Sequence, residues 1–220
     1  MRNFWKQAAL LLAAIVVLMV PAGCSGDRGG EMVVEPAPAG WEENLLAFRT
    51  DKDERYASAP DTPVHPDDRA GFGGLAYFPP DPAYRLVGPL HLHETQEQFT
   101  ILSTTGKSRP AERYGEFRFR IQGTHLALQV YRLLDSKAPT PVQALFVPFT
   151  DKTSGVESYP AGRYIDLKET EDGRYLLDFN QAFNPLCAYG MPEEYACPVT
   201  PAENRLKVRV EAGEKGYRKG

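Results

Sequence analysis

Apolar and polar residues alternate along much of the chain after Leu75, the pattern of β-strands with one buried face. The clearest case is residues 114–130, where two alternating runs flank Gln122-Gly123. A glycine-containing pair between such runs is typical of a tight hairpin turn. The residues predicted to share the buried face are Phe117, Phe119, Ile121, Leu126, Leu128 and Val130. We therefore predict an antiparallel hairpin with one apolar side.

Further short runs rich in β-branched and aromatic residues predict more strands. They are Phe99–Ser103, Ala144–Phe149, Arg163–Lys168, Tyr175–Phe179 and Leu206–Val210. The pattern lacks the relay helices that a parallel sheet needs between its strands. Many short strands with frequent Gly and Pro predict a mainly β fold, an antiparallel β-sandwich or a small barrel.

One amphipathic helix is predicted near the N-terminus, over Trp41–Tyr56. Trp41, Leu45 and Phe48 recur at helical spacing and are expected to face the sheet. The positions expected on the opposite, polar side are Glu42, Glu43, Arg49, Asp53 and Glu54. Prolines at 60, 63 and 66 end the helix.

The first residues have the pattern of an export signal. Arg2 and Lys6 precede an apolar run from Ala8 to Val20, which is short for a membrane span and suitable for a signal peptide. The sequence VPAGCSG follows, and Ala22-Gly23-Cys24 resembles a bacterial lipobox with Pro21 at the usual leucine. The alternative is an ordinary secretory signal with an incidental cysteine. We expect lipidation at Cys24, which anchors a protein to a membrane surface without spanning it.

Cleavage before Cys24 divides the chain into four parts. We expect a signal peptide over 1–23, a flexible tether rich in Gly, Pro and Ala over 24–40, one β-rich domain over 41–215, and a short tail over 216–220. Cleavage leaves 197 of the 220 residues, and the loss of Arg2 and Lys6 changes the formal net charge from −4 to −6. That charge, with no basic block, argues against nucleic acid as a partner. The expected location is the bacterial cell membrane or outer membrane.

Two cysteines remain in the expected mature domain, in CAYGMPEEYAC. Because exported proteins meet an oxidising compartment, we expect a disulfide between Cys187 and Cys197. The alternative is a metal site, but zinc sites use closer cysteine pairs. No cofactor is evident from the sequence.

Two aspartates stand out in RYIDLKETEDGRYLLDFN, residues 163–180. The turn Thr170-Glu171-Asp172-Gly173 suits a type I turn with a glycine bulge, and it predicts a hairpin. In that register Asp166 lies opposite Asp178, and Tyr164 lies opposite Asn180. Opposed like charges are destabilising, so something must offset the repulsion.

Three interpretations of this pair are open. Arg118 or Arg120 could bridge the two carboxylates at a wet surface, which would be structural only. The pair could hold a hard cation such as calcium together with Asn180. The pair could instead share a proton and perform acid–base catalysis on a sugar or an ester.

Polar residues gather in the neighbouring loops, where a β scaffold commonly carries binding groups. They suit a polar, hydroxyl-bearing or anionic ligand, with arginine as a clamp. The equally physical alternative is that they satisfy backbone groups in turns. The candidate ligand-binding residues are Asp151, Ser154, Glu157, Tyr159, Arg163, Tyr164, Asn180, Asn184, Glu203, Asn204 and Arg205.

Three blocks of the chain resemble a bacterial and archaeal family, the domain of unknown function numbered 1684. The blocks are GFGGLAYFPPDPAYRL, LFVPFTDKTSGVESYPAGRYIDL, and LDFNQAFNPLCAYG with CPVTPAENRLKVRVEAGEK. The resemblance covers roughly Trp41 to Lys215. It implies a single domain that some relatives export and others keep in the cytosol, and it implies no activity.

Two function classes follow from these observations. The favoured hypothesis is a lipid-anchored binding module for a polar small molecule or a glycan, because no complete catalytic set can be assembled. The alternative is a hydrolase-like enzyme that uses Asp166 and Asp178 as its catalytic carboxylates.

Overall fold

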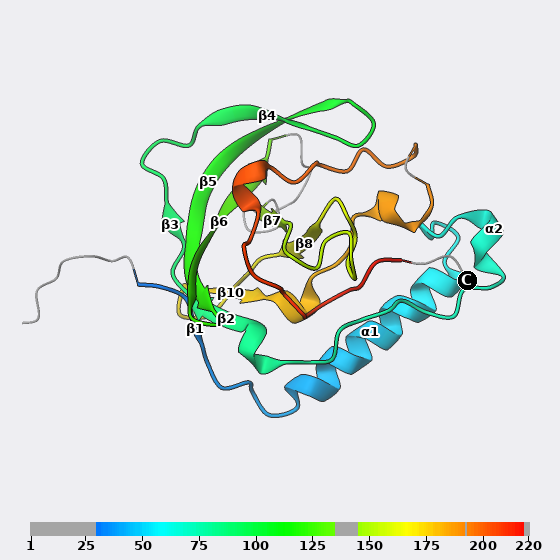
Figure 1. Ribbon diagram of the computed structural model, residues 1–220, viewed down its shortest axis with the longest axis horizontal. Helices are drawn as coiled ribbons and strands as arrows, with labels where there is room; N and C mark the ends of the chain where they lie inside the picture. The colour runs from blue at the N-terminus through cyan, green and yellow to red at the C-terminus, as the bar shows by residue number, and fades with distance from the viewer. Residues whose placement is uncertain (1–29, 135–144, 192, 218–220) are drawn as a thin grey trace, which may run out of the picture.

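The computed structural model describes residues 30–134, 145–191 and 193–217. The expected signal peptide and lipidation site at Cys24 lie outside these residues. Figure 1 shows a β-rich body with one long helix along its side. The helices are α1 (Trp41–Ser58) and α2 (Pro66–Arg69), with short 3-10 turns η1 (Pro82–Tyr84), η2 (Phe179–Gln181), η3 (Leu186–Tyr189) and η4 (Ala202–Asn204). None of the described helices is long and apolar enough to cross a membrane.

The described strands form two antiparallel sheets. This arrangement confirms the predicted mainly β fold and is sandwich-like; the alternative, a closed barrel, is not formed by the described strands. The smaller sheet has the order β1-β2-β10-β9, and the larger has the order β3-β5-β6-β7-β8 with β4 beside β5. The strands are β1 (Val33–Val34), β2 (Arg85–Gly88), β3 (His91–Leu92), β4 (Gln98–Leu102), β5 (Ser108–Ile121), β6 (Thr124–Leu133), β7 (Leu145–Phe149), β8 (Arg163–Asp166), β9 (Lys168–Glu169) and β10 (Tyr175–Asp178).

The predicted hairpin is the longest ladder of the larger sheet. Ile121 pairs with Thr124, so Gln122 and Gly123 alone make the turn. Both have positive φ, 51° and 75°, as a two-residue hairpin turn with the twist of its strands requires. A bulge between Arg113 and Gly115 shifts the register farther along β5.

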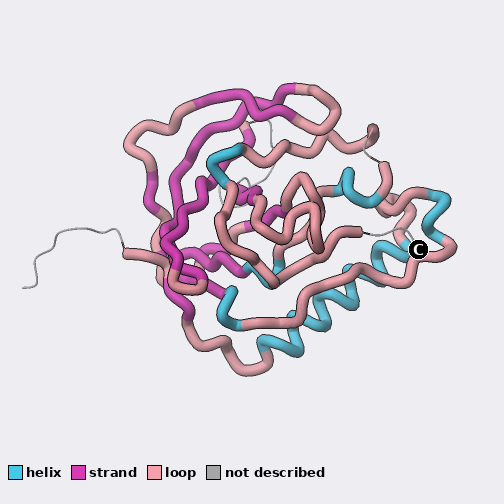
Figure 2. The backbone as a smooth tube through the Cα atoms, in the orientation of Figure 1, coloured by secondary structure: helices cyan, strands magenta, loops and turns pink. Residues whose placement is uncertain are grey.

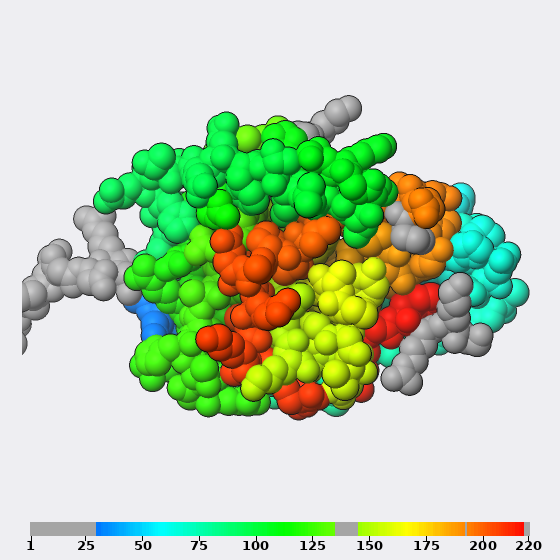
Figure 3. All heavy atoms as spheres, turned by 45° about the horizontal axis from the view of Figure 1, so that its top comes forward, coloured from blue at the N-terminus to red at the C-terminus, as the bar shows by residue number. Residues whose placement is uncertain are grey.

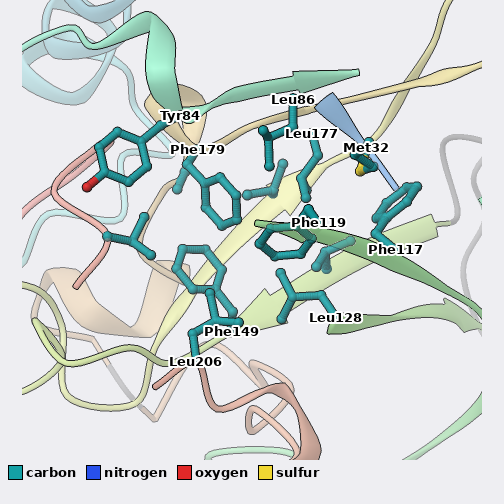
Figure 4. Packing of buried hydrophobic residues seen from close by; sticks show 14 of the residues in the cluster. Met32, Tyr84, Leu86, Phe117, Phe119, Leu128, Phe149, Leu177, Phe179 and Leu206 are labelled. Carbon is teal, nitrogen blue, oxygen red and sulfur yellow. The ribbon is translucent and has the colours of Figure 1, made fainter. Parts of the chain in front are cut away.

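The main core lies between the two sheets (Figure 4). Phe117 and Phe119 of β5 meet Leu86 and Leu177 of the smaller sheet in this cluster. Phe149 and Phe179 pack edge to face with ring centroids 5.2 Å apart. Side chains on alternate positions of β5, β6 and β7 supply this core, which explains the period-two pattern.

Helix α1 forms as predicted and buries Leu45 as predicted, but the rest of its buried face differs from the prediction. Leu45, Arg49, Lys52 and Tyr56 are buried, whereas Phe48 is 48% exposed. The expectation that Phe48 is buried and Arg49 exposed is therefore wrong. The buried cations have partners: Arg49 donates to the carbonyl of Phe78 at 2.9 Å, and Lys52 forms an ion pair with Glu214.

The C-terminal segment 204–214 corrects another prediction. Leu206, Val208, Val210 and Ala212 are buried at alternate positions, as in a strand, but the segment belongs to neither sheet. Figure 2 draws it as a loop, and Figure 3 shows it on the surface between the green strands and the yellow-green loop after β7. The predicted strand Leu206–Val210 is therefore wrong, although its alternation is real.

Arg163 supplies several of the hydrogen bonds that a partner strand would otherwise give the end of this segment. Its guanidinium donates to the carbonyls of Val210 at 2.9 Å, of Glu214 at 3.1 Å, and of Ala212. Asp151, which forms an ion pair with Arg163, accepts from the Val210 amide at 2.7 Å. Backbone bonds hold the start of the segment, because the Thr150 and Lys152 amides donate to the carbonyls of Asn204 and Val208. Arg163 and Asp151 supply further partners for the buried backbone groups of residues 210–214, which lie outside both sheets.

Replacing Arg163 with Met is expected to lower the free energy of unfolding by about 3–5 kcal/mol, because the buried Asp151 carboxylate and three carbonyls lose their donor. Urea denaturation followed by circular dichroism measures this change. Arg205→Met, at an exposed arginine of the same segment, is the matched control and should change stability by less than about 0.5 kcal/mol. Equal small losses in both variants would contradict the role given to Arg163.

Candidate functional site

The two aspartates of the predicted hairpin belong to different sheets. Asp166 ends β8 and pairs with Phe146 of β7, whereas Asp178 ends β10 and pairs with Arg85 of β2. In the hairpin ladder itself, Lys168 pairs with Leu176 and Glu169 pairs with Tyr175. The turn has the expected glycine, since Gly173 has φ 78°. The predicted opposition of Asp166 and Asp178 is wrong because the chain changes sheets between β8 and β9.

Asp178 is built into the protein as a cap. Its side chain is buried, and Oδ1 accepts from the Asn180 amide at 3.0 Å and from the Asn180 side chain at 2.9 Å. The other oxygen, Oδ2, accepts from the Trp41 indole at 3.4 Å. This carboxylate therefore begins the η2 turn and ties helix α1 to it. The shared acid–base site proposed for the pair loses the geometry that motivated it.

Asp166 lies at a cavity of about 410 Å³. In β8, Ile165 points into the main core, so Tyr164 and Asp166 lie on the second face of the larger sheet with Phe146. A second apolar cluster on this face includes Tyr131 and Phe146. The cavity lies between these strands and residues of the segments 183–186 and 195–198.

Aromatic side chains form much of the cavity wall. Tyr164 packs edge to face against Phe146 at 5.8 Å and against Phe183 at 6.0 Å. Its hydroxyl donates to the carbonyl of Pro198, which ties β8 to the opposite wall. The complete set of lining residues is Arg109, Leu133, Leu145, Phe146, Tyr164, Asp166, Phe183, Pro185, Leu186, Tyr195, Ala196, Cys197 and Pro198.

The Asp166 side chain is exposed at the cavity, and its carboxylate is partly desolvated. Surrounding protein removes water from it and raises its pKa, and the positive charges of Lys168 and Lys52 offset this only in part. Both lysines are hydrogen bonded elsewhere, Lys168 to Gln181 at 3.1 Å and Lys52 to Glu214. Within the described part of the chain, no group donates a hydrogen bond to Asp166.

Five of the predicted ligand-binding residues are buried away from this cavity. Asn204 donates to the carbonyl of Pro148 at 2.7 Å and accepts from the Gln129 amide at 2.8 Å. Asn180 accepts from the Asp81 amide at 2.9 Å. Asn184, Asp151 and Arg163 likewise bond to backbone groups. The structure therefore places these five as links between chain segments.

The other predicted residues are scattered. Ser154 bonds within the Asp151 loop, Glu157 forms an ion pair with Arg209, and Arg205 is exposed. Glu203 accepts from Arg113 at 2.9 Å and from Tyr131 at 2.5 Å. Of the predicted catalytic and ligand-binding residues, only Tyr164 and Asp166 line the 410 Å³ cavity.

The residues of the cavity that sequence reasoning missed are mostly apolar. Phe146, Phe183, Tyr195 and Ala196 carry no chemical signature of a site. One available signal was β7, LFVPF, in which every position is buried. A strand without exposed positions has both faces covered, so a second packed layer could have been expected on its far side.

Cys187 and Cys197 lie next to each other as buried free thiols. The Cys187 amide donates to Sγ of Cys197 at 3.3 Å. A hydrogen bond with the Cys197 thiol lowers the pKa of Cys187 to about 6, and nearby Tyr159 adds to this effect. Cys197 also lines the cavity. The expected disulfide is not formed here, and it stays a prediction.

No group of three or more His, Cys, Asp or Glu side chains in the described residues could hold a metal ion. The calcium interpretation also required Asp166 and Asp178 together, and these side chains belong to different sheets.

Comparisons with known proteins give a family and a related structure. The sequence profile described as "Protein of unknown function (DUF1684)" matches residues 70–215. The solution NMR structure of an uncharacterized protein from Haloarcula marismortui is 36% identical, with a TM-score of 0.59, and the match covers 80% of this chain and 94% of that one. A comparison with curated proteins gives no match.

Asp178→Ala is expected to lower the free energy of unfolding by about 1–2 kcal/mol, because the η2 turn loses its cap. Asp166→Asn is the matched variant and should not destabilise the protein at neutral pH. Since the folded state raises the pKa of Asp166, its carboxyl lowers stability as the pH rises from about 4 through the folded value, and Asn removes that loss. Urea denaturation of both variants between pH 3 and pH 8 checks this. A larger loss from Asp166→Asn than from Asp178→Ala would contradict the assignment.

Proposed function

Because this chain belongs to the DUF1684 family, whose description assigns no activity, we propose its function from its own geometry: it binds a small molecule in the cavity beside Asp166. The ligand class we propose is a molecule with an apolar face and polar groups, glycan fragments included. The observation that carries this proposal is the cavity itself, with aromatic side chains in its wall and a partly desolvated carboxylate.

The size and composition of the cavity support binding. Small-molecule sites are commonly hollows of about 300–1,000 Å³ with mostly apolar walls and a few polar groups, and this cavity of about 410 Å³ has that character. Aromatic rings such as Phe146 and Tyr164 can stack on the apolar face of a sugar or on another ring. Asp166 can then orient the ligand by accepting hydrogen bonds.

Binding is supported better than hydrolysis by the same residues. Among the described residues that line the cavity, Asp166 is the one carboxylate and there is no imidazole. The Tyr164 hydroxyl already donates to the Pro198 carbonyl. A two-carboxylate hydrolase needs a second acid beside the first, and Asp178 serves as a cap elsewhere.

A ligand screen tests the proposal. Compounds that raise the melting temperature are selected from a library of glycan fragments and small amphipathic molecules, and isothermal titration calorimetry measures their affinity. Ala196→Phe, which fills the cavity from its wall, should weaken binding of the selected compounds by more than about tenfold, equivalent to about 1.4 kcal/mol.

Ala59→Phe is the control, because Ala59 lines a different hollow that shares Leu186 and Tyr195 with this one. It should leave binding unchanged. The proposal fails if no compound binds, or if the selected compounds bind Ala196→Phe as tightly as the original protein.

We further propose that the mature protein is exported and held on the bacterial cell membrane or outer membrane by a lipid on Cys24. The charged start, the apolar run Ala8–Val20 and the lipobox-like Ala22-Gly23-Cys24 support this. Export would also expose the adjacent thiols of Cys187 and Cys197 to oxidation, which favours a disulfide between them.

Cys24→Ser is expected to move the protein from the membrane fraction to the soluble fraction, because the acyl chains lose their attachment atom. Fractionation of expressing cells, followed by immunoblotting, measures this. Wild-type protein from the membrane fraction should then lose reactivity toward thiol reagents at Cys187 and Cys197 unless it is first reduced. Unchanged fractionation would refute the lipid anchor, and reactive thiols before reduction would refute the disulfide.

A further inference from the structure

The charge balance of the cavity suggests which ligands it prefers. Two charged side chains, Arg109 and Asp166, are among the lining residues. Arg109 already takes part in an interaction of its own. Asp166, by contrast, accepts no hydrogen bond from any described group.

The two lysines whose positive charges act on Asp166, Lys168 and Lys52, also have hydrogen-bond partners of their own. Lys52 is buried, forms an ion pair with Glu214, and lies 5.3 Å from the Phe183 ring centroid. Lys168 donates to Gln181 at 3.1 Å. These contacts leave the Asp166 carboxylate, which is exposed at the cavity and partly desolvated, without a bonded counter-charge. A cationic ligand would supply a charge-assisted hydrogen bond to it.

The rings beside Asp166 favour the same sign of charge. Tyr164 packs against both Phe146 and Phe183, and all three residues line the cavity. The faces of aromatic rings attract cations, more strongly where water is excluded. The rings also offer an apolar surface of the size of one ring or a short alkyl chain.

We propose that the cavity is selective for organic cations, a primary amine on a compact apolar body. The ammonium group donates to the Asp166 carboxylate, and the apolar body packs against Phe146, Tyr164 and Phe183. This inference rests on the proposed function and narrows its ligand class.

Three probes of similar shape separate charge from size: phenethylamine, 2-phenylethanol and phenylacetate, which are positive, neutral and negative at pH 7. Isothermal titration calorimetry should show that phenethylamine binds the purified protein at least about tenfold more tightly than 2-phenylethanol, with phenylacetate weakest. Asp166→Asn should remove this preference and leave the affinity for 2-phenylethanol unchanged.

Glu169→Gln is the matched control, because it neutralises a nearby exposed carboxylate that does not line the cavity. It should retain the preference for the amine. The inference is overturned if 2-phenylethanol binds as tightly as phenethylamine, if Asp166→Asn keeps the preference, or if none of the three probes binds. Neutral compounds that bind the original protein but not Ala196→Phe would leave the proposed function standing while overturning the charge preference. Failure of the whole library would refute both.

Discussion

The fold depends on one buried guanidinium. Arg163 is fully buried between Asp151 and the carbonyls of the C-terminal segment, which belongs to neither sheet. Glycine stands on either side of this junction, at Gly162 and Gly213, both with positive φ. A Cβ at Gly162 would lie 2.7 Å from the Thr200 hydroxyl, and one at Gly213 would lie 2.6 Å from the Phe179 carbonyl. Arginine and glycine thus let the last segment complete the core without a ladder.

The same arginine sets the orientation of the candidate site. Side chains alternate across a strand, so the burial of Arg163 and Ile165 toward the main core places Tyr164 and Asp166 on the other face of β8. There residues of the segments 183–186 and 195–198 form the opposite wall of the cavity. The first of these segments is also tied to the core network, because the Asn184 amide donates to Glu214 at 2.8 Å. The position of the cavity therefore follows from how the C-terminal residues are held.

Local rules were sufficient for much of the fold. The hairpin turn at Gln122-Gly123, the turn glycine at 173 and the alternation in β5 and β6 depend on near neighbours, and the structure has them. The buried face of α1 could not be predicted, because the partner of Lys52 is Glu214, 162 residues away. The predicted pairing of Asp166 with Asp178 failed for a similar reason. Asp166 pairs with β7 and Asp178 pairs with β2, two strands that lie outside the hairpin. The sequence of the cavity wall has no periodic pattern, so Tyr164 and Asp166 were the only lining residues predicted to bind a ligand or act in catalysis.

Native-state hydrogen exchange tests the central role of Arg163 most directly. The amides of Val210 and Glu214 are bonded to Asp151 and to the Ala182 carbonyl, outside any ladder. If Arg163 makes this segment part of the core, both amides exchange in the original protein only through global unfolding, as slowly as the amides of β5 and β6. In Arg163→Lys they should exchange faster than those strands, through a local opening. Rapid exchange of these two amides in the original protein would contradict the account.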